Sequence, residues 1–146
     1  REFMNRDSVK GKLEAVGVAV FLEQPEVHTG AGVGIFDEDV QAETETAGEL
    51  GLKHFSLPWD GHDNEIDPAM VSRFLEIIED PANLPALVHC KRGAERTGTL
   101  IAVYRMEHDG WTNEQAYEEM DKYKFRSIWF GHLKRYVLEY EHDRAP

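Results

Sequence analysis

The chain has 146 residues, 41% of them hydrophobic, which is enough for one domain with one sizeable core. Its 28 acidic residues outnumber its 16 lysines and arginines, and the formal net charge is −12. This charge excludes a general nucleic-acid binder, which needs a broad basic surface. No run of about 18 apolar residues occurs, so no membrane span is expected. Residues 4–146 are predicted to form the domain, and residues 1–3 resemble a cloning remnant.

The first predicted elements are strands around an acidic helix. Residues 15–21 are rich in valine and apolar on both faces, which predicts a strand, and residues 33–36 form a short candidate strand. A helix is predicted over residues 37–50, and Gly51 takes the C-cap role that ends it. Residues 52–57 alternate between apolar and polar side chains, as a half-buried strand does.

The middle of the chain predicts a helix followed by a buried strand. Asp67 stands at the N-cap position and Pro68 at the first helical position. The helix carries a core-facing stripe at helical spacing, formed by Val71, Phe74, Leu75 and Ile78. An apolar strand begins at Ala86, and the helix that comes after it is apolar on most sides and ends near Gly110.

The last part of the chain predicts two further helices. Thr112 and Gln115 have the spacing of a capping box, and the final helix has a stripe of Leu133, Tyr136, Val137 and Tyr140. Strands that alternate with helices predict an α/β domain with a largely parallel sheet of about four to five strands and helices on both faces. Such sheets bind ligands at the carboxyl ends of their strands, so we expect the site at the end of the Ala86 strand.

The residues after that strand form a predicted phosphate-binding loop. A loop between a strand end and a helix start points backbone N–H groups inward, and the helix dipole adds positive charge. Together they make an anion site of phosphate size. Gly93 permits the tight curl, and Arg96 supplies a planar fork for two phosphate oxygens. The loop comprises His89, Cys90, Lys91, Arg92, Gly93, Ala94, Glu95 and Arg96.

Cys90 is the only cysteine of the chain and cannot form an internal disulfide, which fits a reducing cytoplasm. A lone cysteine is usually a small buried hydrophobic residue, but the positive loop around Cys90 favours a thiolate. A thiolate under a bound phosphate is an in-line nucleophile, and its product is a phosphocysteine that water must cleave. We expect Thr97 to donate its hydroxyl to the sulfur and ease its departure, and His89 to fix the loop through backbone hydrogen bonds.

The pattern His-Cys-x-x-Gly-x-x-Arg-Thr-Gly resembles the phosphate loop of cysteine-dependent protein tyrosine and dual-specificity phosphatases. The resemblance spans Gly51 to about Tyr140 and is strongest from Leu87 to Met120, where the chain is similar to small atypical dual-specificity members. It implies a phosphatase-type loop in an α/β fold, with water as the second substrate. The other six histidines show no metal-ligand spacing, so neither a metal nor an organic cofactor is expected.

In the resembled family an aspartate on a loop upstream of the cysteine protonates the leaving oxygen and then activates water. Residues 57–65 offer such a loop, marked by Pro58 and Gly61. The candidates, in order of preference, are Asp60, which lies thirty residues before Cys90, then Asp63 and then Glu65. The family's order of tryptophan, proline and aspartate is not kept, because proline comes first here. The competing interpretation of Asp60 is a turn-forming carboxylate that bonds its own backbone.

The charges are unevenly spread along the chain. Asp37 to Glu49 contains six acids and no base, whereas Lys122 to Arg135 contains five bases and no acid. With Lys91 and Arg92, the second stretch is a candidate basic rim for a polyanionic substrate. The loop start Cys-Lys-Arg-Gly also resembles atypical dual-specificity enzymes that act on inositol polyphosphates and pyrophosphates. The competing interpretation is that helix surfaces alternate in sign by chance.

The sequence therefore predicts a phosphatase of phosphate monoesters, with a protein tyrosine or dual-specificity phosphatase acting on a phosphorylated protein as the first interpretation. The alternative is a phosphatase of a small phosphorylated metabolite, an inositol polyphosphate or pyrophosphate. A catalytically weak phosphate-binding module is the second alternative, which the intact Cys90 and Arg96 disfavour. A sulfurtransferase would not need Arg96 and Thr97, and arsenate reduction usually recruits further thiols.

Overall fold

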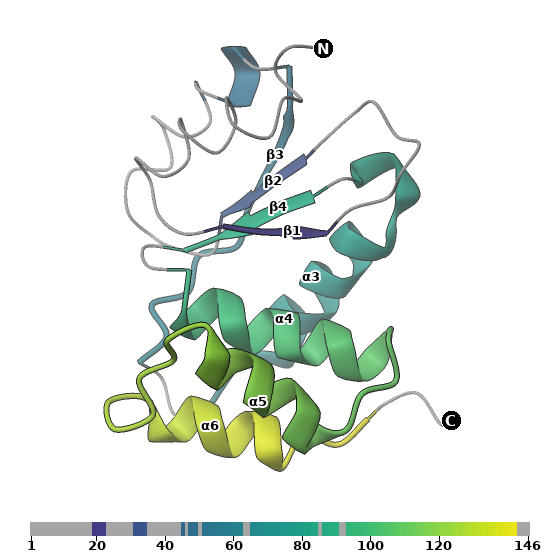
Figure 1. The fold of residues 1–146 in the computed structure, drawn as a ribbon. Helices are drawn as coiled ribbons and strands as arrows, with labels where there is room; N and C mark the ends of the chain where they lie inside the picture. The colour runs from purple at the N-terminus through teal and green to yellow at the C-terminus, as the bar shows by residue number, and fades with distance from the viewer. Residues whose placement is uncertain are drawn as a thin grey trace.

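The computed structural model describes residues 19–22, 31–34, 45, 47–49, 51–62, 65–84, 86–90 and 93–142. In this part of the chain one sheet has four strands in the order β1-β4-β2-β3 (Figure 1). They are β1 (Ala19–Leu22), β2 (Ala31–Gly34), β3 (Lys53–Ser56) and β4 (Ala86–His89). β2 pairs in parallel with β3 and β4, whereas the edge strand β1 is antiparallel to β4. The sheet is therefore largely parallel, as the sequence predicts.

The helices with full descriptions follow β3 in the chain. They are α3 (Pro68–Glu79), the 3-10 helix η2 (Pro81–Asn83), α4 (Glu95–Glu107), α5 (Asn113–Lys122) and α6 (Gly131–Leu138). Figure 1 shows α3 and α4 next to one side of the sheet, with α5 and α6 as a further layer beyond α4. Most of the acidic helix predicted over residues 37–50 lies outside the described residues, so helices on both faces stay a prediction.

Short-range signals in the sequence determine where several of these elements begin and end. At the start of α3, the Ala69 N–H donates to Asp67 Oδ1 at 2.9 Å, with Pro68 in the first position. At the start of α5, Thr112 and Gln115 exchange the two hydrogen bonds of a capping box, at 3.0 and 3.2 Å. Gly51, with φ of 68°, closes the preceding helical residues as predicted.

α4 is the central helix of the core. Leu100, Ala102 and Val103 are at most 1% exposed, because the helix is covered on one side by the sheet and on the other by α5 and α6. Two predicted stripes differ in detail from the structure. In α3, Ile77 is buried and Leu75 only partly so. In the last stripe, Leu133 and Val137 are buried but Tyr136 and Tyr140 are only partly buried.

None of the described helices combines the length and apolar character that crossing a bilayer requires.

Candidate active site at the carboxyl end of β4

Cys90 is the first residue after β4 and lies at the carboxyl end of that central strand, where the sequence predicts the site. Only 2% of the residue is exposed. The Gly93 N–H donates to Cys90 Sγ at 3.1 Å, and an amide hydrogen bond of this kind stabilises negative charge on sulfur. Gly93 has φ of 67°, in the left-handed region that favours glycine, so the curl of the loop depends on it. Lys91 and Arg92 lie outside the described residues.

The N-terminus of α4 faces the same loop. Its N-cap residue is Ala94, which makes no side-chain hydrogen bond to the first N–H groups of the helix. No cap side chain therefore competes with an anion for these groups. Thr97, in the first turn, is fully buried, and its Oγ1 has no hydrogen-bond partner among the described residues. His89 is 1% exposed. The roles predicted for Thr97 and His89 stay predictions.

Arg96 connects the phosphate loop to residues 59–62, which we call the acid segment. Its Nη1 donates to the Trp59 carbonyl at 2.8 Å. Gly61, with φ of 79°, packs against the aliphatic part of the same side chain: a Cβ added there would lie 2.8 Å from Arg96 Cγ. Asp60 stands between these two contact residues. The structure thus brings together the segment of the preferred acid candidate and the arginine of the loop.

Asp60 itself is exposed, and its Oδ1 accepts a hydrogen bond from the His62 N–H at 2.8 Å. This is the turn-forming bond of the competing interpretation. It occupies one carboxylate oxygen and holds the side chain in a defined direction. Glu65 is exposed as well, and Asp63 lies outside the described residues.

A second loop, residues 123–130 between α5 and α6, contacts both parts of the site; we call it the α5–α6 loop. Arg126 Nε donates to Glu95 Oε1 at 2.7 Å, and the Glu95 side chain is only 6% exposed. The Phe130 ring stacks on the His62 ring with centroids 5.5 Å apart. Just beyond, His132 Nε2 lies 2.7 Å from the Gly61 carbonyl oxygen.

These contacts were not foreseen from the sequence. His132 has no metal-ligand spacing, and Arg126 belongs to the predicted basic rim. A contact between residues 71 positions apart, as for His132 and Gly61, leaves no local pattern in the sequence. Arg126 is paired with Glu95, and Lys134 lies 5.0 Å from the Tyr117 ring centroid, so two bases of the predicted rim are already engaged.

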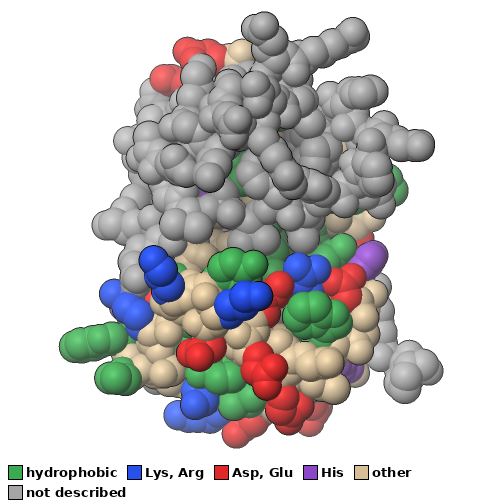
Figure 2. Space-filling model, in the orientation of Figure 1, with side chains coloured by type: hydrophobic (Ala, Val, Ile, Leu, Met, Phe, Trp, Pro, Cys, Tyr) green, Lys and Arg blue, Asp and Glu red, His purple; other side chains and the backbone are tan. Residues whose placement is uncertain are grey.

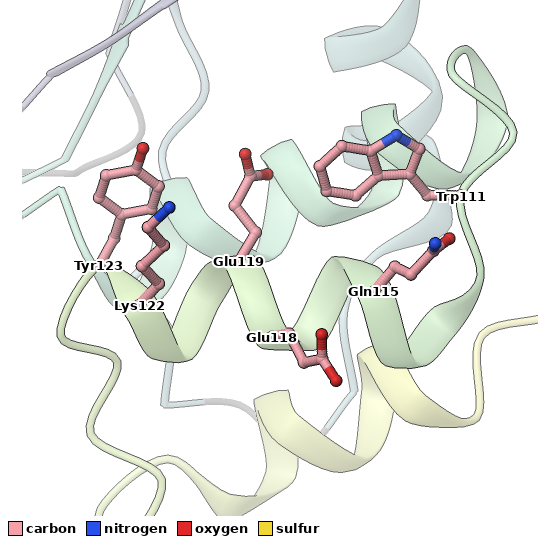
Figure 3. Close-up of a pocket in the computed structure, with 6 residues that line it drawn as sticks. All are labelled: Trp111, Gln115, Glu118, Glu119, Lys122 and Tyr123. Carbon is pink, nitrogen blue, oxygen red and sulfur yellow. The ribbon is translucent and has the colours of Figure 1, made fainter.

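A hollow of about 310 Å³ lies along α5 (Figure 3). It is lined by Trp111, Gln115, Glu118, Glu119, Lys122 and Tyr123. Arg105 forms two hydrogen bonds with Glu119 at 3.1 Å and stacks over Trp111 at 5.0 Å, so the charge of Glu119 is paired within the protein. Among the described residues, no three His, Cys, Asp or Glu side chains are grouped as metal ligands.

A loop that carries the pattern His-Cys-x-x-Gly-x-x-Arg between a buried parallel strand and the central helix is the arrangement expected of dual-specificity-type phosphatases. A family model described as "DSP-PTPase phosphatase fused to NAD+ Kinase" matches residues 61–134, which is just over half of the chain. The chain belongs to this phosphatase family.

The relatives include a protein named as an inositol diphosphatase and others named as dual specificity protein phosphatases. The chain is 32% identical over 78 residues to inositol diphosphatase SIW14 of Saccharomyces cerevisiae, covering 51% of this chain and 27% of that protein. It is 36% identical over 76 residues to the dual specificity protein phosphatase TpbA of Pseudomonas aeruginosa, covering 51% of this chain and 34% of that protein. The chain thus spans about a third or less of the length of these curated relatives.

Solved structures of both relatives share the fold. The core catalytic domain of SIW14, described as a PP-IP phosphatase and solved with citrate, superimposes with a TM-score of 0.66 at 25% identity, covering 79% of this chain and 70% of that one. TpbA in complex with phosphotyrosine gives 0.63 at 25% identity, covering 80% of this chain and 68% of that one.

Proposed function

We propose that the chain is a cysteine-dependent phosphatase that hydrolyses phosphate monoesters through a phosphocysteine intermediate. The observation that carries this proposal is the junction at Arg96. Cys90 is buried, and its Sγ accepts a hydrogen bond from the Gly93 N–H of the loop at 3.1 Å. Arg96 of the same loop contacts the backbone on both sides of Asp60. Nucleophile, anion site and acid candidate thus belong to one connected structure.

In the first step the Cys90 thiolate attacks phosphorus in line with the leaving oxygen. A sulfur–phosphorus bond forms, the bond from phosphorus to the leaving oxygen breaks, and Asp60 gives that oxygen a proton. The loop amides and Arg96 hold the remaining phosphate oxygens, whose charge they neutralise.

In the second step water attacks the phosphocysteine. The Asp60 carboxylate takes a proton from the water, an oxygen–phosphorus bond forms, and the sulfur–phosphorus bond breaks to release phosphate and the thiolate. Thr97 donates its hydroxyl to the departing sulfur. The burial of Thr97 in the first turn of α4, with its hydroxyl free of partners among the described residues, supports this role.

Hydrolysis of p-nitrophenyl phosphate without added metal tests the proposal. We expect turnover by the wild type and none by Cys90→Ser, while Cys90→Ser still binds phosphate, because the loop amides and Arg96 remain. Vanadate binding without turnover in the wild type would favour the phosphate-binding module instead. Equal rates in both proteins would exclude the cysteine mechanism.

A phosphorylated protein is the substrate class that the surface near the site supports best. Ile128 and Trp129 are 92% and 76% exposed, in a turn whose flanking residues Arg126 and Phe130 contact Glu95 and His62. Figure 2 shows hydrophobic side chains standing out at the left edge of the surface, where Figure 1 places the α5–α6 loop. Such side chains gain binding energy from apolar residues of a peptide and little from a polar inositol phosphate.

The name of one relative, an inositol diphosphatase, keeps inositol polyphosphates and pyrophosphates as the second candidate substrates. Comparing Trp129→Ala with the wild type separates the two classes. We expect kcat/KM to fall about tenfold on a phosphotyrosine peptide with apolar flanking residues, and to stay unchanged on p-nitrophenyl phosphate. Tyr123→Ala is the matched control, since Tyr123 is also exposed but lines the hollow along α5. Faster turnover of an inositol pyrophosphate than of every phosphopeptide tried would reverse the assignment.

A further inference from the structure

The acid segment is held from both sides of Asp60 by groups distant in the sequence. On one side, Arg96 Nη1 donates to the Trp59 carbonyl at 2.8 Å. On the other, His132 Nε2 lies 2.7 Å from the Gly61 carbonyl oxygen. A carbonyl oxygen only accepts hydrogen bonds, so the hydrogen of this bond is on His132 Nε2. The backbone on each side of Asp60 is therefore anchored by a cationic or imidazole donor.

His132 is itself held in place by its surroundings. It lies in the first turn of α6, is partly buried, and its ring centroid is 6.0 Å from that of Phe130. Phe130 in turn stacks on His62 at 5.5 Å and lies under the Arg126 guanidinium at 5.3 Å. Arg126 is paired with the buried Glu95 at the start of α4. The donor that contacts Gly61 is thus fixed relative to the phosphate loop.

Asp60 needs such anchoring because its side chain is exposed and is not packed by a core. Among the described residues, its carboxylate accepts a hydrogen bond only from the His62 N–H, two residues along the same segment. The position of its carboxylate relative to Arg96 is then determined by the backbone of the acid segment, whose residues Trp59 and Gly61 contact that arginine. A displacement of about 1 Å in a reacting group lowers a rate by as much as 100-fold.

We propose that His132 is a positioning residue for the reaction: through its hydrogen bond to the Gly61 carbonyl it holds Asp60 where it can protonate the leaving oxygen. This inference rests on the proposed function, in which Asp60 is the acid. Its consequence is specific. The more basic the leaving oxygen, the more the first step depends on a proton from Asp60. A loosened acid segment therefore slows basic leaving groups most.

The test measures kcat and KM on p-nitrophenyl phosphate, phenyl phosphate and an alkyl phosphate, in order of increasing leaving-group basicity. His132→Phe keeps an aromatic ring and removes the donor, whereas His132→Gln keeps a donor. We expect His132→Phe to lower kcat about 10-fold to 100-fold on the alkyl ester, much less on p-nitrophenyl phosphate, with KM little changed. His132→Gln should recover part of the loss. His142→Phe, which removes a surface histidine bonded to Asn113, is the control.

A double variant distinguishes this inference from the proposed function. In an Asp60→Asn background, His132→Phe should cause no further loss, because there is no acid left to position. An equal loss on all three esters, or additive losses with Asp60→Asn, would overturn the positioning role while leaving the acid assignment intact. If the loss of kcat caused by Asp60→Asn does not increase with the basicity of the leaving group, the acid assignment fails and the role of His132 fails with it.

Discussion

At Gly61 the backbone of the acid segment packs closely against the Arg96 side chain. Its φ of 79° lies in the left-handed region, and an added Cβ would stand 2.8 Å from Arg96 Cγ and 3.2 Å from Cδ. Backbone conformation and close approach each exclude a larger residue at this position. The distance between the backbone beside Asp60 and the Arg96 side chain therefore depends on a glycine that itself has no role in the proposed chemistry.

Gly61→Ala should consequently lower both stability and activity. Left-handed strain in a non-glycine residue costs about 1–3 kcal/mol, and the contact with Arg96 forces either the acid segment or the guanidinium to move. We expect kcat/KM on p-nitrophenyl phosphate to fall at least about 10-fold. Gly110→Ala is the matched control, because Gly110 has a similar φ of 70° but open space around its would-be Cβ. Loss of activity in both variants would show that strain alone, and not the contact, is responsible.

The α5–α6 loop contacts both the start of α4 and the acid segment. Arg126 reaches the first residue of α4, while Phe130 stacks on His62, the last residue of the acid segment. Backbone hydrogen bonds from Trp129 and Phe130 to the Arg126 carbonyl, at 3.1 and 3.0 Å, close the turn between these two contacts. The pair Glu95–Arg126 therefore determines where the loop lies against α4.

Removing the charge of Arg126 should destabilise the protein through Glu95. Arg126→Met removes the guanidinium that pairs with the buried Glu95 carboxylate at 2.7 Å, and we expect the free energy of unfolding in urea to fall by about 1–3 kcal/mol. Adding Glu95→Gln should restore part of this free energy, since the charge that Arg126 balanced is then gone. The exposed pair Arg73–Glu76 is the comparison: Arg73→Met should cost less than about 1 kcal/mol. Simple additivity of the Glu95 and Arg126 variants would contradict a direct coupling.

The molecule as a whole is organised around α4, which lies between the sheet and the layer of α5 and α6 (Figure 1). At the far end of α4 from the site, Arg105 bonds to Asp109 at 2.8 Å and to Glu119 of α5 at 3.1 Å. This cluster fastens α5 to the end of the central helix. Its charges make the stability of the whole domain depend on pH.

Asp109 sets the direction of that dependence. Burial alone would raise the pKa of Asp109, but hydrogen bonds with His108 and Arg105 and their positive charges outweigh it, so the pKa lies below the ordinary 3.8. A carboxyl with a lowered folded-state pKa adds stability above its unfolded pKa and loses it as pH falls through the folded value. Asp109→Asn should therefore flatten the decline in unfolding free energy below about pH 5. If urea titrations of Asp109→Asn show the same decline in unfolding free energy at low pH as the wild type, Asp109 contributes nothing to that decline.

Features set by neighbouring residues could be predicted from the sequence. The N-cap Asp67, the capping box of Thr112 and Gln115 and the strand before Cys90 all depend on contacts within a few positions, and the structure has them where expected. In α3, Ile77 is buried and Leu75 is only partly buried, whereas the sequence predicts Leu75 in the core-facing stripe. This difference depends on the angle at which α3 meets the core, which periodicity alone does not determine.

Contacts across the fold could not be predicted. His132 meets Gly61 across 71 positions and Arg126 meets Glu95 across 31, so only the completed packing of α6 and the α5–α6 loop brings them together. The sequence predicts Asp60 and Arg96 as site residues on two separate segments. The geometry that joins them through Trp59 and Gly61 depends on the folded chain.

The most direct test of the cysteine mechanism is to trap the intermediate. We would mix Asp60→Asn with excess p-nitrophenyl phosphate, quench in acid within milliseconds, and locate the modification by mass spectrometry of peptides. In the proposed mechanism the variant lacks the base that activates water, so the intermediate should accumulate. We expect one phosphoryl group on Cys90 and none in the matching Cys90→Ser protein. Turnover without a phosphoryl group on Cys90, or with one on another residue, would contradict the mechanism.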